Sequence, residues 1–474
     1  MSITVKQPHE KELFGHPVGL YVLFFVEMWE RFSYYGMRAI LTLYLAAPIL
    51  LGNPQSGFGW SNTETISFYG TYTMFVYLTS IPGGWIADKF IGQKKAVMIG
   101  GILLCIGHGI LAVNSELAFF SGLIFIVIGV GFLKPNISTM VGGLYKTGDD
   151  RRDKGFYVFY IGINLGAFLG ALIVGLVAAK YGWHYGFGLA GIGMALGQIV
   201  YMYGLKYLTN VGEFIGKAGS PNKDLLKKPL NKVEKDRMLV MFLSFLIIIV
   251  FWGAFEQAGG LISLYTEQKT NRVLSFTVPL IGNEIPAAVF QSINAFFIIV
   301  LGTAVGGFWY KWKNKGKESS SLFKMAVGVI IMAFGFFFMS KAATEVVMNG
   351  NEIVEKSAMI WLVLAYLFHT IGELCASPVA LSFITKLAPI KYASFMMGAY
   401  FAATGLGNKV AGLIGGMSEN AGDFEVFTGI GITCTIFGLL ILAILKPLKR
   451  LTHGAEDRDE NYIKEIENLK VTDN

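Results

Sequence analysis

Charged residues and cysteines are scarce in this chain of 474 residues. Only 15% of the residues are charged and 54% are hydrophobic, whereas a soluble domain has about 25% charged residues. This deficit excludes a water-soluble fold of this size. The three cysteines, Cys105, Cys375 and Cys434, all lie in apolar runs. They therefore provide neither a disulfide framework nor the spacing of a metal site, and we expect them to be packing residues.

The sequence also lacks the local signals of enzymes and of secretion. It contains no Gly-x-Ser-x-Gly turn and no Gly-Lys-Ser/Thr phosphate loop, and His9-Glu10 lacks the second histidine of a zinc motif. We therefore expect no enzymatic activity, no metal and no bound cofactor. The first apolar run contains Glu27 and Glu30, which argues against a cleavable signal peptide.

Apolar runs of about 20 residues recur along the whole chain, and each is long enough to cross a bilayer. We predict an all-α integral membrane protein with twelve transmembrane helices in two six-helix bundles, an arrangement typical of transporters. The predicted spans are 18–47, 61–87, 95–113, 117–144, 155–178, 184–207, 238–264, 286–309, 323–340, 357–385, 394–417 and 424–446. The corresponding domains are an N-terminus (1–17), an N-terminal bundle (18–208), a polar linker (209–237), a C-terminal bundle (238–446) and a tail (447–474).

The distribution of basic residues predicts the orientation. Lysine and arginine together number 39, against 32 acidic residues. With the N-terminus inside, 30 of these 39 fall in cytoplasmic segments or at the cytoplasmic ends of spans, and five fall in outer loops. Because cytoplasmic loops carry the excess of basic residues, both termini and the linker are predicted to be cytoplasmic in a plasma (inner) membrane protein. Membrane topology thus accounts for the net charge of +7, and we expect no nucleic-acid partner.

Apart from the first and last four residues of each predicted span, the spans contain eight charged residues, four of each sign: Glu27, Glu30, Glu256, Glu373, Arg31, Arg38, Lys134 and Lys409. An ionisable group in a bilayer is costly and marks a functional site by default. Glu27, Glu30 and Arg31 share one helix face at spacings of three and four residues. Lys134 precedes Pro135, which disrupts helical hydrogen bonding and can open a polar lumen. A static ion network is the alternative, although neutral packing would hold helices together at lower cost.

Other polar residues recur at helical spacing, and a basic turn follows the second span. The polar positions are Tyr160, Asn164, Trp252, Glu256, Gln291, Asn294, His369, Glu373 and Ser377. Each alone is typical of a helix–helix hydrogen bond, but together they suggest a cavity of both signs that suits a zwitterion. The turn contains Gly84, Asp88, Lys89 and Gly92, and we predict that it takes part in conformational gating.

The stretch from Glu27 to Tyr35 resembles the ExxERFxYY motif of proton-coupled oligopeptide transporters (the POT, or PTR2, family), a branch of the major facilitator superfamily. Similar segments recur across all twelve spans, and the turn from Gly84 to Lys95 is similar to the general loop motif of the superfamily. The other matching segments are Gly131–Asn136, Phe156–Gly166, Phe251–Gln257, Gln291–Asn294 and Gly372–Pro378.

This resemblance implies import of di- and tripeptides by symport with protons through alternating access, with protons as the only coupling ion. It places proton coupling on Glu27, Glu30, Arg31 and Lys134. It places the peptide carboxylate at Arg38 and Lys134, and the amine at Glu373 with Asn164 and Asn294. The remaining substrate-binding residues are Tyr34, Tyr35, Tyr77, Trp252, Glu256, Ser377 and Tyr400. The expected partners are peptides and the lipid bilayer, with a monomer as the functional unit.

Three departures from the family pattern qualify these expectations. The linker 209–237 is too polar and too short for the two extra helices of many bacterial members. Tyr400 occupies an aromatic position that is usually Trp in the family. Gly70 lies near the position of a histidine that some members use in proton coupling. Two other functions stay open: transport of another small anion or zwitterion, such as nitrate or a peptide-like metabolite, and a receptor that does not transport. Glu373 favours a substrate with an amine.

Overall fold

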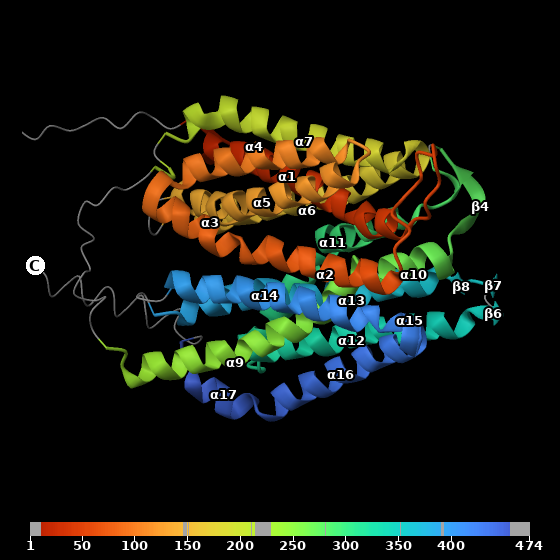
Figure 1. Ribbon diagram of the computed structural model, residues 1–474. Helices are drawn as coiled ribbons and strands as arrows, with labels where there is room; N and C mark the ends of the chain where they lie inside the picture. The colour runs from red at the N-terminus through yellow and green to blue at the C-terminus, as the bar shows by residue number, and fades with distance from the viewer. Residues whose placement is uncertain are drawn as a thin grey trace, which may run out of the picture. The chain divides into compact units, whose positions relative to one another are not determined.

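The computed structural model describes residues 11–145, 149, 151–209, 211–213, 229–279, 281–350, 352–389 and 393–455 (Figure 1). In these residues the fold is helical, with four short two-stranded pairs: β1–β2, β3–β8, β4–β5 and β6–β7. Residues 1–10 of the predicted N-terminus, most of the predicted linker and residues 456–474 of the predicted tail lie outside the described residues.

The helices correspond one for one to the predicted spans. They are α1 (Val18–Ala46), α2 (Asn62–Leu78) with α3 (Ser80–Ile86), α4 (Gln93–Leu111), α5 (Glu116–Gly143), α6 (Arg151–Tyr181), α7 (Trp183–Gly204), α9 (Lys232–Phe255) with η3 (Glu256–Ala258) and α10 (Leu261–Lys269), η4 (Ala287–Gln291) with α11 (Ser292–Asn314), α12 (Ser321–Glu345), α13 (Met359–Leu387), α14 (Ala393–Gly416) and α16 (Asp423–Ala443). Within the described residues, nine of these segments are long and apolar enough to cross a membrane. The others are α1, which carries Glu27, Glu30, Arg31 and Arg38, the 17-residue α2, and α14, which carries Asn408 and Lys409.

Shorter elements complete the described chain. They are η1 (Ala87–Ile91), η2 (Leu205–Tyr207), α15 (Ser418–Ala421), α17 (Leu445–Leu451), β1 (Glu12–Leu13), β2 (His16–Pro17), β3 (Thr270–Asn271), β4 (Val273–Val278), β5 (Gly282–Glu284), β6 (Val347–Asn349), β7 (Glu352–Glu355) and β8 (Ser357–Ala358). β1 and β2 precede α1, and the other β-strands lie in segments that join helices. The fold is therefore an all-α membrane fold, as predicted.

The chain forms two compact units. Unit 1 comprises Met1–Ser61, Phe75–Ala218 and Val273–Ile299, and unit 2 comprises Asn62–Met74, Gly219–Arg272 and Val300–Asn474. The division passes through α2 and α11, so these two helices each contribute to both units. The bundle boundaries at 208 and 238 stay a prediction.

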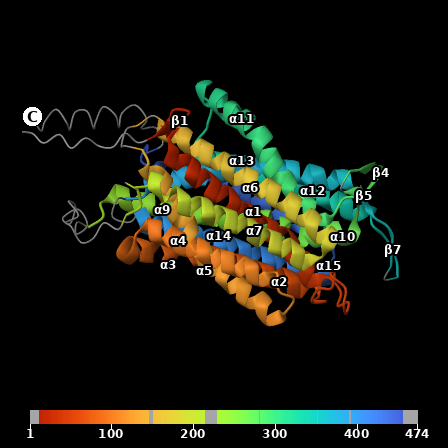
Figure 2. The same ribbon diagram turned by 90° about the horizontal axis from the view of Figure 1, so that it is seen from above.

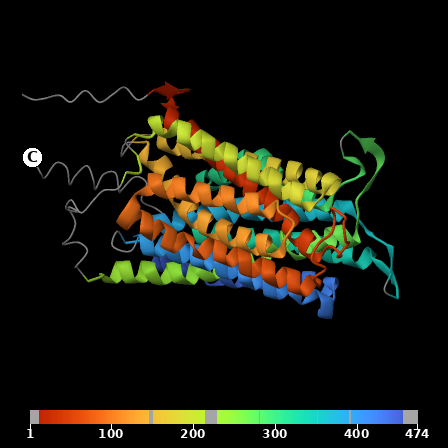
Figure 3. The ribbon, with the colours of Figure 1, turned by 45° about the horizontal axis from the view of Figure 1, so that its top comes forward.

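In unit 1 the helices run lengthwise beside one another, and α1 packs against both α6 and α7 (Figures 1 and 3). Small residues allow this approach, since a Cβ added at Gly166 would lie 2.1 Å from the carbonyl oxygen of Met28. The hydroxyl of Ser33 donates to the carbonyl oxygen of Ala190 at 2.7 Å and joins α1 to α7. Helix α1, which carries the buried charged residues, thus packs closely against both α6 and α7.

In unit 2 the first part of α2 packs against α14 through Gly70 and Gly412. The backbones are so close there that a Cβ added at Gly70 would lie 2.7 Å from Gly412 Cα. The other main packing pairs in this unit are α12 with α13, α12 with α16, and α9 with α14. Gly70, the residue that stands near the family's histidine position, is therefore a contact between helices.

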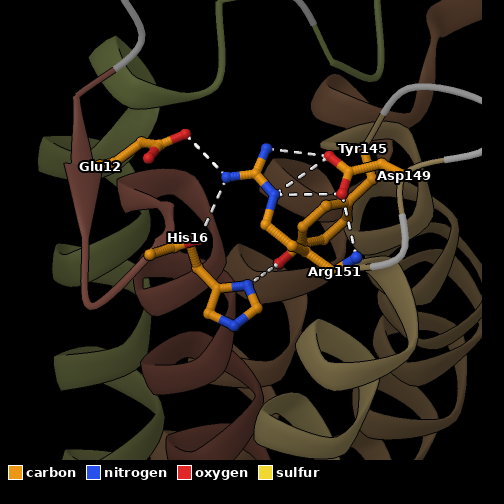
Figure 4. Close-up of polar contacts among 6 residues, drawn as sticks. Glu12, His16, Tyr145, Asp149 and Arg151 are labelled. Atoms are coloured by element: carbon orange, nitrogen blue, oxygen red, sulfur yellow. Dashed lines mark hydrogen bonds and ion pairs between the residues drawn. The ribbon is translucent and has the colours of Figure 1, made fainter.

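A small hairpin, β1–β2, joins the cytoplasmic ends of α5 and α6 in the predicted topology (Figure 4). Arg151 donates through Nη1 to Glu12 Oε1 at 2.9 Å and to the carbonyl oxygen of Gly15 at 3.2 Å, and through Nη2 to Asp149 Oδ2 at 2.9 Å. The Nδ1 atom of His16 lies 2.8 Å from the Tyr145 hydroxyl. Hydrogen bonds from Arg151 lower the pKa of Asp149, which favours the ionised form of this carboxyl group.

Pro135 lies inside α5, which continues through it to Gly143. The proline has no N–H to donate to the carbonyl of Gly131, and α3 lies against that carbonyl. A Cβ added at Gly83 would lie only 2.1 Å from Gly131 O, whereas one at Gly84 would meet Pro135 Cβ at 3.7 Å. Gly83 is therefore the glycine on which the α3–α5 contact depends.

We expect Gly83→Ala to destabilise the protein by about 1–3 kcal/mol through overpacking, and Gly84→Ala to leave stability nearly unchanged. The measurement is thermal unfolding of both purified variants in detergent. Equal melting temperatures for the two variants would contradict the close contact at Gly83.

Candidate functional site

The most deeply buried charges of unit 1 lie on α1. Arg31 Nε donates to Glu27 Oε1 at 2.7 Å and lies 3.0 Å from Glu30 Oε2. The three residues are 2%, 1% and 5% exposed for Glu27, Glu30 and Arg31. The predicted sharing of one helix face is confirmed, because residues three and four apart are neighbours on a helix. Two carboxylates thus share one guanidinium.

Some carboxylate oxygens of this cluster accept no hydrogen bond. Within the described residues, Glu27 Oε2 and Glu30 Oε1 are buried without a hydrogen-bond partner. A buried carboxylate oxygen without a donor is costly. Protonation of one carboxyl would remove part of that cost, since two carboxylates and one guanidinium carry an excess negative charge. The arrangement can therefore accept a proton.

Lys134 of α5 lies in the same unit. Its ammonium is 3.7 Å from the ring centroid of Tyr77, and it interacts electrostatically with Glu30. Tyr77 and Lys134, which the sequence placed in different spans, are thus brought together. The amide of Asn136 donates to the carbonyl oxygen of Phe132 at 2.7 Å, which satisfies a polar group beside Pro135.

Two tyrosines and an arginine continue the stripe on α1. Tyr34 and Tyr35 meet edge to face, with ring centroids 5.5 Å apart. The guanidinium carbon of Arg38 lies 5.5 Å from the centroid of the Tyr35 ring, within the range of a cation–π contact. Arg38 is 6% exposed. Unit 1 therefore holds the predicted carboxylate-binding residues Arg38 and Lys134, each beside an aromatic ring.

The residues predicted to bind a peptide amine fall in different units. Asn164 is 5% exposed on α6, and its amide donates to the carbonyl oxygen of Tyr160 in its own helix at 2.9 Å. Asn294 lies in the first turn of α11, also in unit 1, and Glu373 lies on α13 in unit 2. Their joint role stays a prediction.

Three predicted residues of unit 2 lie together. The indole of Trp252 hydrogen-bonds with the Tyr400 hydroxyl, and Glu373 interacts electrostatically with Tyr400. Tyr400 is 7% exposed. Ser377, one turn beyond Glu373 on α13, has a buried hydroxyl without a hydrogen-bond partner among the described residues. Trp252 and Glu373 thus both interact with Tyr400 within unit 2.

Glu256 is engaged with a residue that the sequence did not single out. The hydroxyl of Tyr69 donates to Glu256 Oε2 at 2.9 Å, and Glu256 is 3% exposed. Nearby in unit 2, Lys409 Nζ donates to the Thr71 hydroxyl at 2.6 Å. Tyr69 and Thr71 are neutral residues among several other hydroxyl-bearing residues of α2, so no sequence signal distinguishes them. The two bonds connect the first part of α2 to η3 and α14.

The predicted gating turn folds as a π-helical turn followed by a bend. After α3, the turn η1 (Ala87–Ile91) ends at Gly92, whose φ of +80° favours glycine. Lys89 Nζ lies 5.0 Å from the Trp85 ring centroid. Burial raises the pKa of Asp88, and a hydrogen bond with Gln93 opposes that shift. The turn thus joins α3 to α4 through Asp88 and Gly92, while its role in gating stays a prediction.

The fold and the buried charges define a multi-pass membrane transporter. The model of the POT family matches residues 94–226 and 218–428. The chain is 33% identical to the peptide transporter YePEPT of Yersinia enterocolitica over 519 residues, covering 96% of this chain and 99% of the relative. It is also 33% identical to a di-/tripeptide transporter of Lactococcus lactis, covering 93% and 98% of the two chains.

Solved structures of POT transporters are also similar to this chain. A crystal structure of a peptide transporter POT in complex with sulfate matches with a TM-score of 0.82 and 32% identity over 93% of this chain and 97% of that chain. A POT family transporter in complex with 5-aminolevulinic acid matches with a TM-score of 0.83 and 29% identity over 93% and 98%. This chain belongs to the POT family. It is a transporter and not an enzyme, as predicted.

We expect Arg31→Met to lower the free energy of unfolding by about 3–5 kcal/mol, because it leaves two buried carboxylates without their cation. The matched control is Arg151→Met, which removes an arginine from ion pairs that are largely solvent-exposed, where such pairs contribute little. Thermal unfolding of both variants in detergent is the measurement. A similar decrease in melting temperature in the two variants would show that Arg31 contributes no more to stability than Arg151.

Proposed function

We propose that this protein imports di- and tripeptides by symport with protons, through alternating access and without a bound cofactor. The observation that carries this proposal is the α1 cluster, in which Glu27 and Glu30 share Arg31 and leave carboxylate oxygens without a donor. Such a cluster can gain and lose a proton within the membrane. The similarity to transporters named for peptides supports the choice of substrate.

In this proposal the two ends of the peptide are bound and its side chains are not. Arg38 and Lys134 bind the carboxylate, and Glu373 with Asn164 and Asn294 binds the amine. The tyrosines of unit 1 and the Trp252–Tyr400 pair of unit 2 provide aromatic surfaces for variable side chains. Because every short peptide has both charged ends, a site of this kind accepts many sequences.

Coupling follows from competition for Lys134. With a carboxylate of the Glu27/Glu30 pair ionised, Lys134 is attracted to it. Protonation removes that attraction and frees Lys134 for the peptide carboxylate. The proton and the substrate thus favour the same state, which is the thermodynamic requirement of symport. Closely interacting carboxyls titrate as a pair, so the proton belongs to the pair.

We further propose a plasma (inner) membrane location, cytoplasmic termini and a monomeric functional unit. The topology is supported by the 30 of 39 basic residues on the predicted cytoplasmic side. Two functional residue sets on one chain, one in each unit, support the monomer.

A second candidate is transport of another small anion or zwitterion. It is favoured by the POT family structures solved with 5-aminolevulinic acid and with sulfate. Competition for uptake of a labelled dipeptide separates the candidates. Inhibition by unlabelled dipeptides, without inhibition by nitrate or free amino acids, supports the peptide proposal, and the reverse pattern contradicts it.

We expect Glu30→Gln to abolish uptake driven by an inward proton gradient and to leave peptide counterflow intact, because the carboxyl that accepts the proton is gone. The measurement is dipeptide uptake in proteoliposomes with an imposed pH gradient. Glu116→Gln, at the exposed start of α5, is the matched control and should behave as wild type. Loss of both uptake and counterflow, with normal peptide binding, would remove Glu30 from the coupling role.

We expect Glu373→Gln to weaken dipeptide binding by about 10–100-fold, the range for loss of a charge-assisted hydrogen bond. The same change should have little effect on an N-acetylated dipeptide, which has no ammonium. Binding of both peptides to both proteins provides the measurement. An equal loss for the two peptides would mean that Glu373 does not bind the amine.

A further inference from the structure

An apolar pocket of about 450 Å³ lies in unit 2 between the C-terminal part of α11 and the helices α12 and α13. Its walls include Ala304, Trp309 and Trp312 of α11, Phe323 of α12 and Cys375 of α13. In Figure 2 the C-terminal part of α11 stands apart from α12 and α13. Side chains rather than close backbone contact therefore bridge these helices.

The pocket is separate from the candidate substrate site. Ile371 and Cys375 line it, and these residues lie on one face of α13. Glu373 stands two residues from each of them, which is about 200° around a helix with 3.6 residues per turn. The pocket and Glu373 are therefore on opposite faces of α13.

Two indole rings are fixed at this pocket. Trp309 Nε1 donates to Cys375 Sγ at 3.4 Å, and Trp312 Nε1 donates to the carbonyl oxygen of Glu318 at 2.7 Å. Their polar atoms are thus satisfied, and their apolar surfaces line the cavity. Tryptophan is typical of the depth at which hydrocarbon meets headgroups.

Lysines surround the end of α11 where the pocket lies. The five are Lys311, Lys313, Lys315, Lys317 and Lys324. Lys317 Nζ lies 4.2 Å from the Trp312 ring centroid, and Lys324 Nζ lies 5.4 Å from that of Trp309. Ammonium groups thus lie directly beside two aromatic walls of the pocket.

Glu318 is the one acid in the sequence between Lys311 and Lys324, and it already has partners. It accepts from Lys449 Nζ at 2.7 Å and from the backbone N–H of Ser320 at 2.8 Å. Burial raises the pKa of Glu318, but these bonds outweigh burial and lower it to about 2. Glu318 is thus ionised, and Lys449 balances its charge, so the five lysines leave an excess of positive charge at the rim.

We propose that this pocket binds an anionic phospholipid, with an acyl chain between α11, α12 and α13 and the headgroup phosphate at Lys317 and Lys324. Charge complementarity identifies the occupant. A basic pocket between helices suits an anionic headgroup, and an apolar cavity next to it suits a hydrocarbon chain. A free phosphate ion would use the lysines alone, and an uncharged amphiphile would use the pocket alone. The bound lipid bridges α11 to its neighbours, and the site does not depend on which solute is transported.

The test measures binding of phosphatidylglycerol and phosphatidylcholine to the delipidated full-length protein in detergent, by native mass spectrometry and by thermal stabilisation. We expect tighter binding of phosphatidylglycerol. Lys317→Gln with Lys324→Gln should weaken it about tenfold or more. Lys232→Gln with Lys235→Gln, which removes two exposed lysines at the start of α9, should leave it unchanged. Inorganic phosphate should not compete at millimolar concentration.

A second pair of variants tests the hydrocarbon part without changing charge. Ala304→Phe fills the pocket, whereas Thr303→Phe adds the same ring at an exposed neighbour that does not line it. Loss of phosphatidylglycerol binding in the first variant alone supports the site. Equal affinity for the two lipids, equal effects of the two lysine pairs, or unchanged binding in Ala304→Phe would each overturn the proposal.

Discussion

The need to pair charge inside the membrane is the constraint on which this structure depends. A guanidinium or carboxylate without a partner in a low-dielectric interior costs several kcal/mol. Helix α1 meets this constraint within itself, because Glu27 and Glu30 lie within one turn of Arg31. The pairing allows an ionic helix to pack as tightly as an apolar one, with α6 and α7 held against it by glycine contacts and by the Ser33 hydrogen bond.

The ion pairing on α1 is incomplete, and this allows the cluster to accept a proton. One guanidinium cannot neutralise two carboxylates, so the cluster interacts with Lys134 of α5 and retains oxygens without donors. By contrast, Glu256 of unit 2 accepts a hydrogen bond from the Tyr69 hydroxyl, and Lys409 donates one to the Thr71 hydroxyl. These two buried charges of unit 2 thus have neutral hydroxyl partners, whereas the α1 cluster can accept a proton.

Much of the fold and part of the site could be predicted from the sequence. The number of helical segments and their approximate positions followed from the length of apolar runs, since a segment of about 20 residues can span a bilayer. The α1 cluster followed from spacings of three and four residues. Tyr69, Thr71 and the clasp of Glu12 with Arg151 could not be found in this way. Their partners are distant in sequence, and neutral or surface residues carry no local signal.

The sequence placed Gly84 in the predicted gating turn but did not mark its neighbour Gly83, which makes the tight contact with Gly131. Local pattern determines that a helix forms and which of its residues share a face, because both depend on near neighbours and on the bilayer thickness. It thus determined the helices, the family and the charge cluster. Only the tertiary structure decided which face meets which neighbour, because packing depends on the shapes of helices far apart in the chain. That is why the Lys134–Tyr77 contact, the Trp252–Tyr400 bond and the pocket beside α11 became visible only once the helices were assembled.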